Sequence, residues 1–498
     1  MTGQMTGLTD GGIAVIVRMI CMLLGLAVIG LAAPGLAPAQ TMPTQTMPTQ
    51  TMPAQTMKVP ASQAEISLGF VPVVRQSAPA VVSIYTRKVV ERRTSRFAGD
   101  PFFERLFGDL FRGGPTRRRI ENSLGSGVIV DPSGIVVSNY HVVSGADEIT
   151  IVLTDRREFE GRVILADKEA DLAIVQLEGA SGLPALELRD SDTLEVGELV
   201  LAIGNPFGVG QTVTSGIVSG LARSGAPGGR RQGYFIQTDA AINPGNSGGA
   251  LVDMAGRLIG VNTSIISRSG GSNGIGFAVP SNLVARVIAA AQEGATALDR
   301  PWLGLQAQPV TGEIAEALGL ERPAGILVDQ LHPESAFAKA GVETGDVLLT
   351  IDGEVVNAPA ELAFRTATLG TGRAAELRYL RGGKEHKTSV ELAPAPDRPD
   401  RDRTVLQRPR HLRGLTVINV NPAVIDQYRL PLASAGILVA AVDGPAKRSG
   451  LRPGDMIFAV NGRAVGDVDA LEAAVRRSRE FVLQIERKGR RGNIQVGG

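Results

Sequence analysis

A glycine-rich turn stands near the middle of the chain, where the sequence runs Asn243-Pro244-Gly245-Asn246-Ser247-Gly248-Gly249-Ala250. A nucleophilic serine must present its hydroxyl on a tight turn, and backbone N–H groups of that turn must face the oxyanion that develops during acyl transfer. Glycine permits such a turn and leaves room for a substrate. The stretch makes Ser247 a candidate nucleophile, and an ordinary glycine-rich turn is the alternative interpretation.

Two residues upstream are candidates for activating Ser247. His141 follows Ser138-Asn139-Tyr140 at the end of an apolar run and is the only histidine before residue 300. Serine activation needs a general base that titrates near neutral pH, which is the property of histidine. Asp171 opens another apolar run and could orient the imidazole, although an acid in that place is more often a turn residue. The chain order His, Asp, Ser is that of the chymotrypsin-type barrels.

The chain from about residue 66 to residue 293 has a β-rich pattern. Short apolar runs alternate with Gly, Pro, Asn and Asp, which favour turns. Many short strands with turns between them indicate a barrel or a sandwich. A closing helix is expected over 281–292, with Ser281 as its N-cap. The predicted strands are 126–130, 135–138, 149–153, 163–166, 172–177, 199–203 and 258–264.

The last two hundred residues contain an internal repeat. Gly325-Ile326-Leu327-Val328 recurs as Gly436-Ile437-Leu438-Val439, and two further matches follow at a nearly constant offset. Ordered matches of this kind indicate two copies of one structural unit. Residues 395–411, between the copies, are rich in proline, aspartate and arginine, which predicts a linker.

Together these stretches resemble the HtrA family of Do-like peptidases, from about residue 66 to the end of the chain. The resemblance implies a mainly β fold. A chymotrypsin/trypsin-like double β-barrel protease domain is expected over 66–293, followed by PDZ domains, which are small α+β barrels, over 301–394 and 412–498. The other matching motifs are Gly204-Asn205-Pro206-Phe207-Gly208, Gln237-Thr238-Asp239-Ala240-Ala241-Ile242-Asn243 and Gly274-Ile275-Gly276-Phe277-Ala278-Val279-Pro280.

The resemblance also implies roles for particular residues. His141 would be the general base, Asp171 its orienting acid and Ser247 the nucleophile. The oxyanion hole would be formed by the N–H groups of Gly245 and Ser247, with Asn246 between them. The family's regulatory loop corresponds to the phenylalanine-rich insertion around Asp100-Pro101-Phe102-Phe103.

The first PDZ domain is expected to bind peptides through Trp302-Leu303-Gly304-Leu305. A PDZ domain binds a peptide by strand addition and caps its carboxylate with backbone N–H groups. Arg413-Gly414-Leu415-Thr416 holds the corresponding place in the second domain and matches the family pattern less well. The alternative is that one or both PDZ domains serve only in assembly of the protein and do not bind peptides.

The pocket for the side chain before the scissile bond is expected to carry no charge. Trypsin-like enzymes that select basic residues have an aspartate six residues before the nucleophile, and this chain has Ala241 there. The facing strand contributes Ser264, Ile265 and Ile266. Because an unpaired buried Lys or Arg costs several kcal/mol, we expect small or aliphatic residues at this position. A loose pocket with little preference is the alternative.

Residues 1–39 are predicted to be a cleavable signal peptide. Arg18 precedes an apolar run over 19–33, and Ala37-Pro38-Ala39 fits a cleavage site. The run is shorter than the roughly 20 residues that span a bilayer, although a retained anchor is the alternative. Residues 40–65 are predicted to be a flexible linker, because 40–57 repeat Thr-Met-Pro. The mature chain would be periplasmic. It would contain no cysteine, because the only cysteine of the chain, Cys21, lies in the predicted signal peptide.

Composition excludes several other functions. The formal net charge is +1, which gives no electrostatic case for binding nucleic acid. The chain has neither a Gly-x-x-x-x-Gly-Lys-Ser/Thr loop nor a metal-ligand cluster, so no cofactor and no metal are expected. The resemblance implies ATP-independent degradation of unfolded proteins, chaperone-like holding of substrates, and a homotrimer or multiples of it. Peripheral membrane association stays open. A non-catalytic scaffold and a signalling protease with one membrane substrate are the rival hypotheses.

Overall fold

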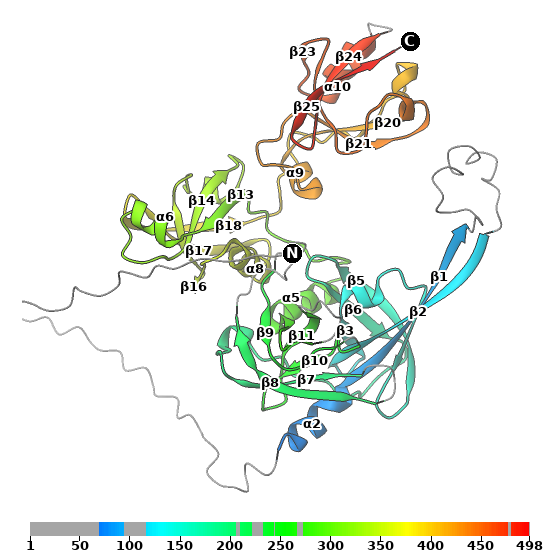
Figure 1. The fold of residues 1–498 in the computed structure, drawn as a ribbon, viewed down its shortest axis with the longest axis vertical. Helices are drawn as coiled ribbons and strands as arrows, with labels where there is room; N and C mark the ends of the chain where they lie inside the picture. Colours follow the sequence, from blue (N-terminus) through cyan, green and yellow to red (C-terminus); the bar gives the residue numbers. More distant parts are fainter. Residues whose placement is uncertain are drawn as a thin grey trace, which may run out of the picture. The chain divides into compact units, whose positions relative to one another are not determined.

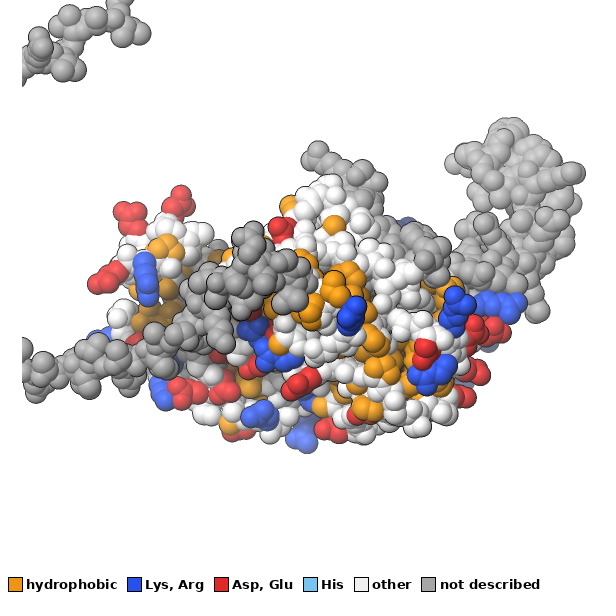
Figure 2. All heavy atoms as spheres, turned by 90° about the horizontal axis from the view of Figure 1, so that it is seen from below, with side chains coloured by type: hydrophobic (Ala, Val, Ile, Leu, Met, Phe, Trp, Pro, Cys, Tyr) orange, Lys and Arg blue, Asp and Glu red, His pale blue; other side chains and the backbone are white. Residues whose placement is uncertain are grey.

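The computed structural model describes residues 69–93, 116–205, 210–221, 233–243, 245–265, 272–476 and 480–497. The predicted signal peptide, the linker over 40–65 and the phenylalanine cluster of 102–111 lie outside the described residues. Within the part that is described, no helix is long and apolar enough to cross a membrane. On the face shown in Figure 2, Asp and Glu side chains lie among Lys and Arg side chains.

The first barrel begins after the short helix α2 (Val71–Ser77) and closes in the order β1-β2-β3-β6-β5-β4. Pairing of β1 with β4 closes it. Alternate side chains of these strands point inward and form an aliphatic core that includes Ile84, Ile129 and Ile151, all fully buried. Figure 1 shows β1 and β2 continuing as a long hairpin beyond the barrel. The strands are β1 (Val81–Arg93), β2 (Thr116–Asp131), β3 (Ile135–Ser138), β4 (Glu148–Val152), β5 (Glu158–Asp167) and β6 (Leu172–Leu177).

The second barrel closes in the order β10-β11-β12-β9-β8-β7 and is followed by helix α5 (Ser281–Gln292). Its core contains Val200, Ile236 and Leu251. Every strand predicted from the sequence lies within or overlaps an observed strand. The sequence pattern missed β1 of the first barrel, and it missed β8, β9, β10 and β12 of the second, which are short or interrupted by glycine. The strands are β7 (Leu199–Gly204), β8 (Thr212–Gly220), β9 (Ile236–Thr238), β10 (Ala250–Val252), β11 (Leu258–Ile265) and β12 (Gly276–Pro280).

The prediction that Ser281 caps helix α5 is wrong, although the bounds of the helix are those expected. The N-cap position is Pro280, which has extended backbone angles at the end of β12, and no side chain caps the helix. Ser281 is fully buried, and its hydroxyl donates to the backbone carbonyl of Arg189. A buried hydroxyl needs a partner, and here the tertiary partner takes precedence over the helix end.

The first copy of the internal repeat, which is expected to be a PDZ domain, is a sheet in the order β13-β14-β15-β17-β18, with β16 paired to β15. Phe337, Leu348 and Leu362 are fully buried in its core. Its strands are β13 (Leu305–Pro309), β14 (Ile326–Leu331), β15 (Val347–Ile351), β16 (Glu354–Val355), β17 (Arg373–Arg381) and β18 (Lys384–Leu392). Its helices are α6 (Gly312–Ala317), α7 (Ala336–Lys339) and α8 (Pro359–Leu369).

The second PDZ domain repeats this sheet with one strand added at its edge, in the order β19-β20-β21-β22-β24-β25, with β23 paired to β22. Its strands are β19 (Thr404–Val405), β20 (Leu415–Asn419), β21 (Ile437–Val442), β22 (Met456–Val460), β23 (Arg463–Ala464), β24 (Phe481–Arg487) and β25 (Arg490–Val496). Its helices are α9 (Pro422–Tyr428) and α10 (Val468–Arg476).

The repeated Gly-Asp pairs of the two domains hold equivalent ion pairs. Asp346 is buried, and its carboxylate accepts hydrogen bonds from Arg381 at 2.7 Å. Asp455 is equally buried and accepts from Arg487 at 2.6 and 2.7 Å. A buried carboxylate is stable only when it is paired and hydrogen-bonded, which explains why the aspartate recurs in both copies.

Candidate active site

The folding of the barrels brings the three candidate residues to one place. His141 lies on the short helix α4 (Tyr140–Val143) that follows β3, and Asp171 lies immediately before β6. Strands β3 and β6 are paired, so residues thirty positions apart in the sequence become neighbours. Ser247 belongs to the second barrel, in the turn between β9 and β10.

His141 is held by the carboxylate of Asp171. The imidazole Nδ1 lies 2.8 Å from Oδ2 and 3.0 Å from Oδ1, and the backbone N–H of His141 donates to Oδ1 at 3.2 Å. The Asp171 side chain is 1% exposed, whereas that of His141 is 42% exposed. A buried carboxylate at Nδ1 favours the tautomer with its proton there, which leaves Nε2 as a proton acceptor.

Asp171 is itself fixed by residues from both barrels. Its backbone carbonyl accepts from Asn139 Nδ2 at 2.9 Å, and its Oδ2 accepts from the hydroxyl of Thr263 at 2.7 Å. Its φ of 55° lies in the left-handed region, which is uncommon for a residue other than glycine. These contacts hold the Asp171 side chain in place and accompany a backbone conformation that the local sequence alone would not favour.

The Ser247 hydroxyl donates to the backbone carbonyl of Thr263 at 3.1 Å. Among the described residues, no hydrogen bond joins it to His141. Nucleophile–base hydrogen bonds are often long or absent in a site without substrate. Thr263, which is 2% exposed, therefore contacts the acid through its side chain and the serine through its backbone. The sequence analysis missed it, although a hydroxyl within a buried strand signals a partner.

The backbone of the serine turn leaves donors available. Neither Gly245 N–H nor Ser247 N–H donates to an oxygen of any described residue, whereas Asn246 N–H donates to the carbonyl of Asn243 at 3.0 Å. Gly248 has a φ of 84°, and a Cβ there would collide with the carbonyl of Ser126. The turn thus requires glycine for both its conformation and its close packing.

Strand β2 of the first barrel is bonded directly to the serine turn. Ser126 Oγ donates to the carbonyl of Gly245 at 2.6 Å and accepts from Asn205 N–H at 2.8 Å. Ser126 N–H donates to the carbonyl of Ser247 at 2.9 Å. These bonds fix the turn relative to the barrel that carries His141 and Asp171. No motif or spacing in the sequence singles out Ser126.

Of the residues expected in the substrate pocket, the structure describes Ala241, Ser264 and Ile265, all in the second barrel. Ala241 is half-buried, and its carbonyl accepts from the Thr214 hydroxyl at 2.9 Å. Ser264 and Ile265 end strand β11, whereas Ile266 lies outside the described residues. The nearby Asp239 directs its carboxylate to Ile217 N–H at 2.7 Å.

Family models match the chain in three places: a trypsin-like peptidase domain over 125–261 and PDZ domains over 301–392 and 436–487. A probable periplasmic serine endoprotease, DegP-like, from Pseudomonas savastanoi pv. phaseolicola is 37% identical over 457 residues, which cover 87% of this chain and 94% of the relative. The chain belongs to the HtrA family. A probable periplasmic serine protease, do/HhoA-like, from Haemophilus influenzae is 38% identical over 80% of this chain and 85% of the relative.

Solved HtrA structures agree with the fold. A variant of the HtrA-type protease AlgW, solved with a decapeptide, is 41% identical with a TM-score of 0.52. The match covers 66% of this chain and 99% of AlgW. The chain is therefore a serine endopeptidase of the HtrA family, with a trypsin-like domain followed by PDZ domains.

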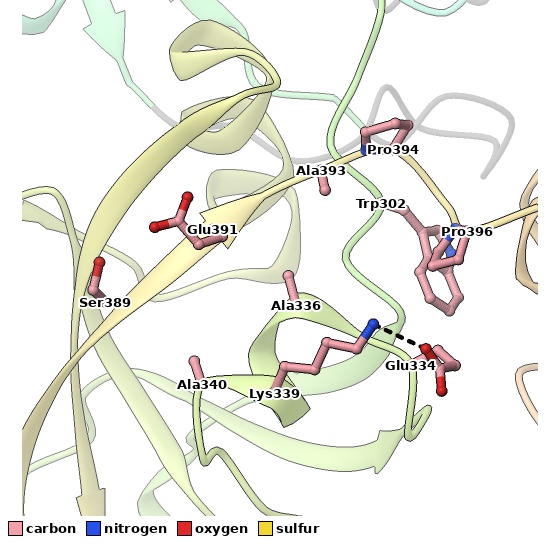
Figure 3. Close-up of a pocket in the computed structure, with 10 residues that line it drawn as sticks. All are labelled: Trp302, Glu334, Ala336, Lys339, Ala340, Ser389, Glu391, Ala393, Pro394 and Pro396. Atoms are coloured by element: carbon pink, nitrogen blue, oxygen red, sulfur yellow. Dashed lines mark ion pairs between the residues drawn. The ribbon is translucent and has the colours of Figure 1, made fainter.

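In the expected carboxylate loop of the first PDZ domain, the backbone of Leu303 and Gly304 differs from that of Trp302 in its hydrogen bonding. Neither Leu303 N–H nor Gly304 N–H donates to an oxygen of any described residue. Trp302 instead donates its N–H to the Ala393 carbonyl at 2.9 Å. The Trp302 indole lies beside Pro396 and lines a pocket of about 280 Å³ (Figure 3). Among the described residues, the backbone N–H groups of Leu303 and Gly304 thus have no acceptor, and the Trp302 ring packs against Gly304.

Proposed function

We propose that the chain degrades unfolded or damaged proteins in the periplasm by an acyl-enzyme mechanism. Ser247 Oγ turns from the Thr263 carbonyl toward His141 Nε2 and attacks the scissile carbonyl carbon. The Oγ–C bond forms as the hydroxyl proton passes to Nε2. His141 then gives this proton to the leaving amine as the C–N bond breaks, and water releases the acyl group by the same steps.

The proposed roles of the other residues follow from their contacts. Asp171 keeps Nδ1 protonated and stabilises the imidazolium that forms, as its distance of 2.8 Å from Nδ1 supports. Gly245 and Ser247 N–H, with Asn246 between them, would bind the oxyanion. The observation that carries the proposal is the buried Asp171 carboxylate, which is bonded both to His141 and to Thr263 beside Ser247.

The first PDZ domain is proposed to capture substrates through their C-terminal residues. A variant of AlgW has been solved with a decapeptide. In this chain the N–H groups of Leu303 and Gly304, which donate to no oxygen of a described residue, support peptide capture at this loop. A tethered capture site raises the concentration of substrate at the protease domain. Residues 1–39 would direct export and be removed, and the mature chain would assemble as a homotrimer or multiples of it, with chaperone-like holding of substrates.

The test is digestion of casein by the mature chain (residues 40–498) beside its Ser247→Ala variant. We expect the variant to lose proteolysis by at least about 10³-fold while its circular dichroism is unchanged. Ser215→Ala, which removes an exposed serine of the same barrel, is the matched control and should cleave normally. Normal cleavage by Ser247→Ala would disprove the assignment.

The same digest distinguishes the rival functions and tests the pocket. A non-catalytic scaffold would leave casein intact, and a narrow signalling protease would cut few of many unfolded proteins. Because Ala241 offers no charge to a basic side chain, the released peptides should end in small or aliphatic residues. A majority that end in Lys or Arg would show that the proposed pocket is wrong.

A further inference from the structure

The two PDZ domains differ at the sheet edge next to their glycine loops. In the first domain, β13 follows Gly304 and is the edge strand of its sheet. In the second domain, β20 follows Gly414 in the same way, but β19 is paired to it on the side that is open in the first domain. The added strand comes from residues 395–411, which the sequence analysis predicted to be a linker.

This segment makes the backbone bonds of an added strand. Thr404 and Val405 pair antiparallel with Val417 and Thr416. Leu406 N–H donates to the Leu415 carbonyl at 2.8 Å. The Leu406 carbonyl accepts from Gly414 N–H at 3.0 Å, and Gly414 belongs to the loop expected to cap a peptide carboxylate. At the other end of the segment, Asn419 N–H donates to the Arg401 carbonyl at 2.7 Å.

The side chains of the segment alternate between the domain and solvent. Leu406 is fully buried in one core cluster with Val468 and Leu471 of helix α10. Val405, one position earlier, is 47% exposed. Leu406 is therefore part of the core to which strand β20 and helix α10 both contribute.

A PDZ domain recognises a peptide by adding it as a strand, by capping its end with backbone N–H groups and by burying alternate side chains. We infer that the second PDZ domain has a peptide groove for an aliphatic C-terminal residue and that residues 401–406 of the same chain occupy this groove. Leu406 takes the place of the terminal residue, and its carbonyl oxygen takes the place of the carboxylate. This inference goes beyond the proposed function, which assigns peptide capture only to the first domain.

The covalent connection favours the internal segment over a free peptide. Residues 407–413 join Leu406 to Gly414, and a short connection gives an effective concentration on the order of millimolar. Hydrogen bonds to the preceding residues add to this, because Asn421 Nδ2 donates to the Pro399 carbonyl at 2.7 Å and to Asp397 at 2.7 Å. A dilute peptide therefore binds only the small fraction of chains whose segment has left the groove.

The first test compares Leu406→Asp with Val405→Asp, both in the mature Ser247→Ala chain. The probe is a fluorescein-labelled peptide of residues 400–406, Asp-Arg-Asp-Arg-Thr-Val-Leu, with a free carboxylate. An aspartate at position 406 cannot stay buried, so the segment should leave, whereas position 405 already faces solvent. We expect Leu406→Asp to bind one more probe per chain, with an affinity at this site about 10-fold or more above that of the parent.

Equal numbers of bound probes in the two variants overturn the inference if hydrogen exchange shows that β24 and β25 are still protected.

A second measurement tests the inference if Leu406→Asp unfolds the domain. Val405→Cys with Thr416→Cys places two cysteines directly opposite in the register, in a mature chain that lacks Cys21. At millimolar probe concentration the reduced form should bind a second probe, whereas the oxidised form should bind only one. Reduction of the oxidised form with dithiothreitol should restore binding of the second probe. Equal uptake by both forms overturns the inference.

Failure of the first PDZ domain to bind peptide would be recognised separately. Every variant contains the first PDZ domain, so this failure would lower the number of bound probes equally in all of them. The difference in probe binding between variants whose second-domain groove is empty and those whose groove is filled would be unchanged.

Discussion

Thr263 lies outside the sequence motifs, yet it contacts both the proposed acid, Asp171, and the proposed nucleophile, Ser247. Its hydroxyl donates to Asp171 Oδ2 at 2.7 Å, and its backbone carbonyl accepts from Ser247 at 3.1 Å. The side chain is almost fully buried, so water cannot replace the hydroxyl if it is lost. The carboxylate that orients His141 would then lack one of its donors.

Thr263→Val tests this role because valine keeps the shape and removes the donor. A hydrogen bond to a charged group contributes about 1.5–3 kcal/mol, so kcat should fall about 10- to 100-fold while KM changes little. Thr263→Ser keeps the hydroxyl and should retain most of the activity. Steady-state kinetics on a short peptide provide the measurement, and an unchanged kcat in Thr263→Val would contradict the role.

At the scale of elements, the turn between β5 and β6 presents Asp171, and Asp167 holds this turn. The Asp167 carboxylate accepts from Arg300 Nη1 and Nη2, both at 2.8 Å, and from Ala170 N–H at 2.7 Å. Burial by itself raises the pKa of Asp167, but the hydrogen bonds and charge of Arg300 outweigh it and hold the pKa below its ordinary value of 3.8. The turn is therefore attached to the segment that enters the first PDZ domain.

Asp167→Asn should lower the free energy of unfolding of the protease domain by about 1–3 kcal/mol at neutral pH. A carboxylate whose pKa is lowered by folding stabilises the protein above its unfolded pKa, and this contribution is lost as the pH falls through the folded pKa. The difference between the variant and the parent should thus be full at pH 7 and shrink below about pH 4. Thermal unfolding over this range provides the measurement.

The control is Asp155→Asn, which removes an exposed carboxylate paired with Arg157 at 2.8 Å. Exposed ion pairs contribute little, so this variant should match the parent at every pH. A stability difference for Asp167→Asn that does not depend on pH would show that its charge is not what matters.

At the scale of the whole chain, the proposed catalytic residues and the proposed capture site lie in different domains. His141, Asp171 and Ser247 all precede residue 293, and the PDZ domains begin after it. Deletion of residues 301–498 should lower the turnover of casein more than that of a short peptide, because only the large substrate benefits from tethering.

Deletion of residues 395–498 is the matched control for this experiment. It removes only the second PDZ domain, whose groove we infer to be filled, so most of the preference for casein should remain. Comparison of kcat/KM for the two substrates in the three chains gives the result. Equal losses for casein and the short peptide after the larger deletion would argue that the first PDZ domain shapes the active site.

Local sequence determined the parts of this protein that depend on neighbouring residues. Strands such as β3 and β6 were predictable because apolar runs end at turn residues, and Ser247 was recognisable because its turn requires glycine on both sides. The repeat in the second half was visible because the same short segments recur in order. His141 and Asp171 were candidates by residue type and chain order before any distance was known.

Only the tertiary structure decided which distant groups meet. Thr263 reaches Asp171 across 92 positions, and Arg300 reaches Asp167 across 133. Residues 401–406 have the composition of a linker, yet they complete the sheet of the second PDZ domain because Leu406 fits its core. These contacts follow from the closure of barrels and sheets, which sets distances that neither composition nor periodicity encodes. A buried polar group must find a hydrogen-bond partner, and which groups are buried is a property of the folded molecule rather than of any segment.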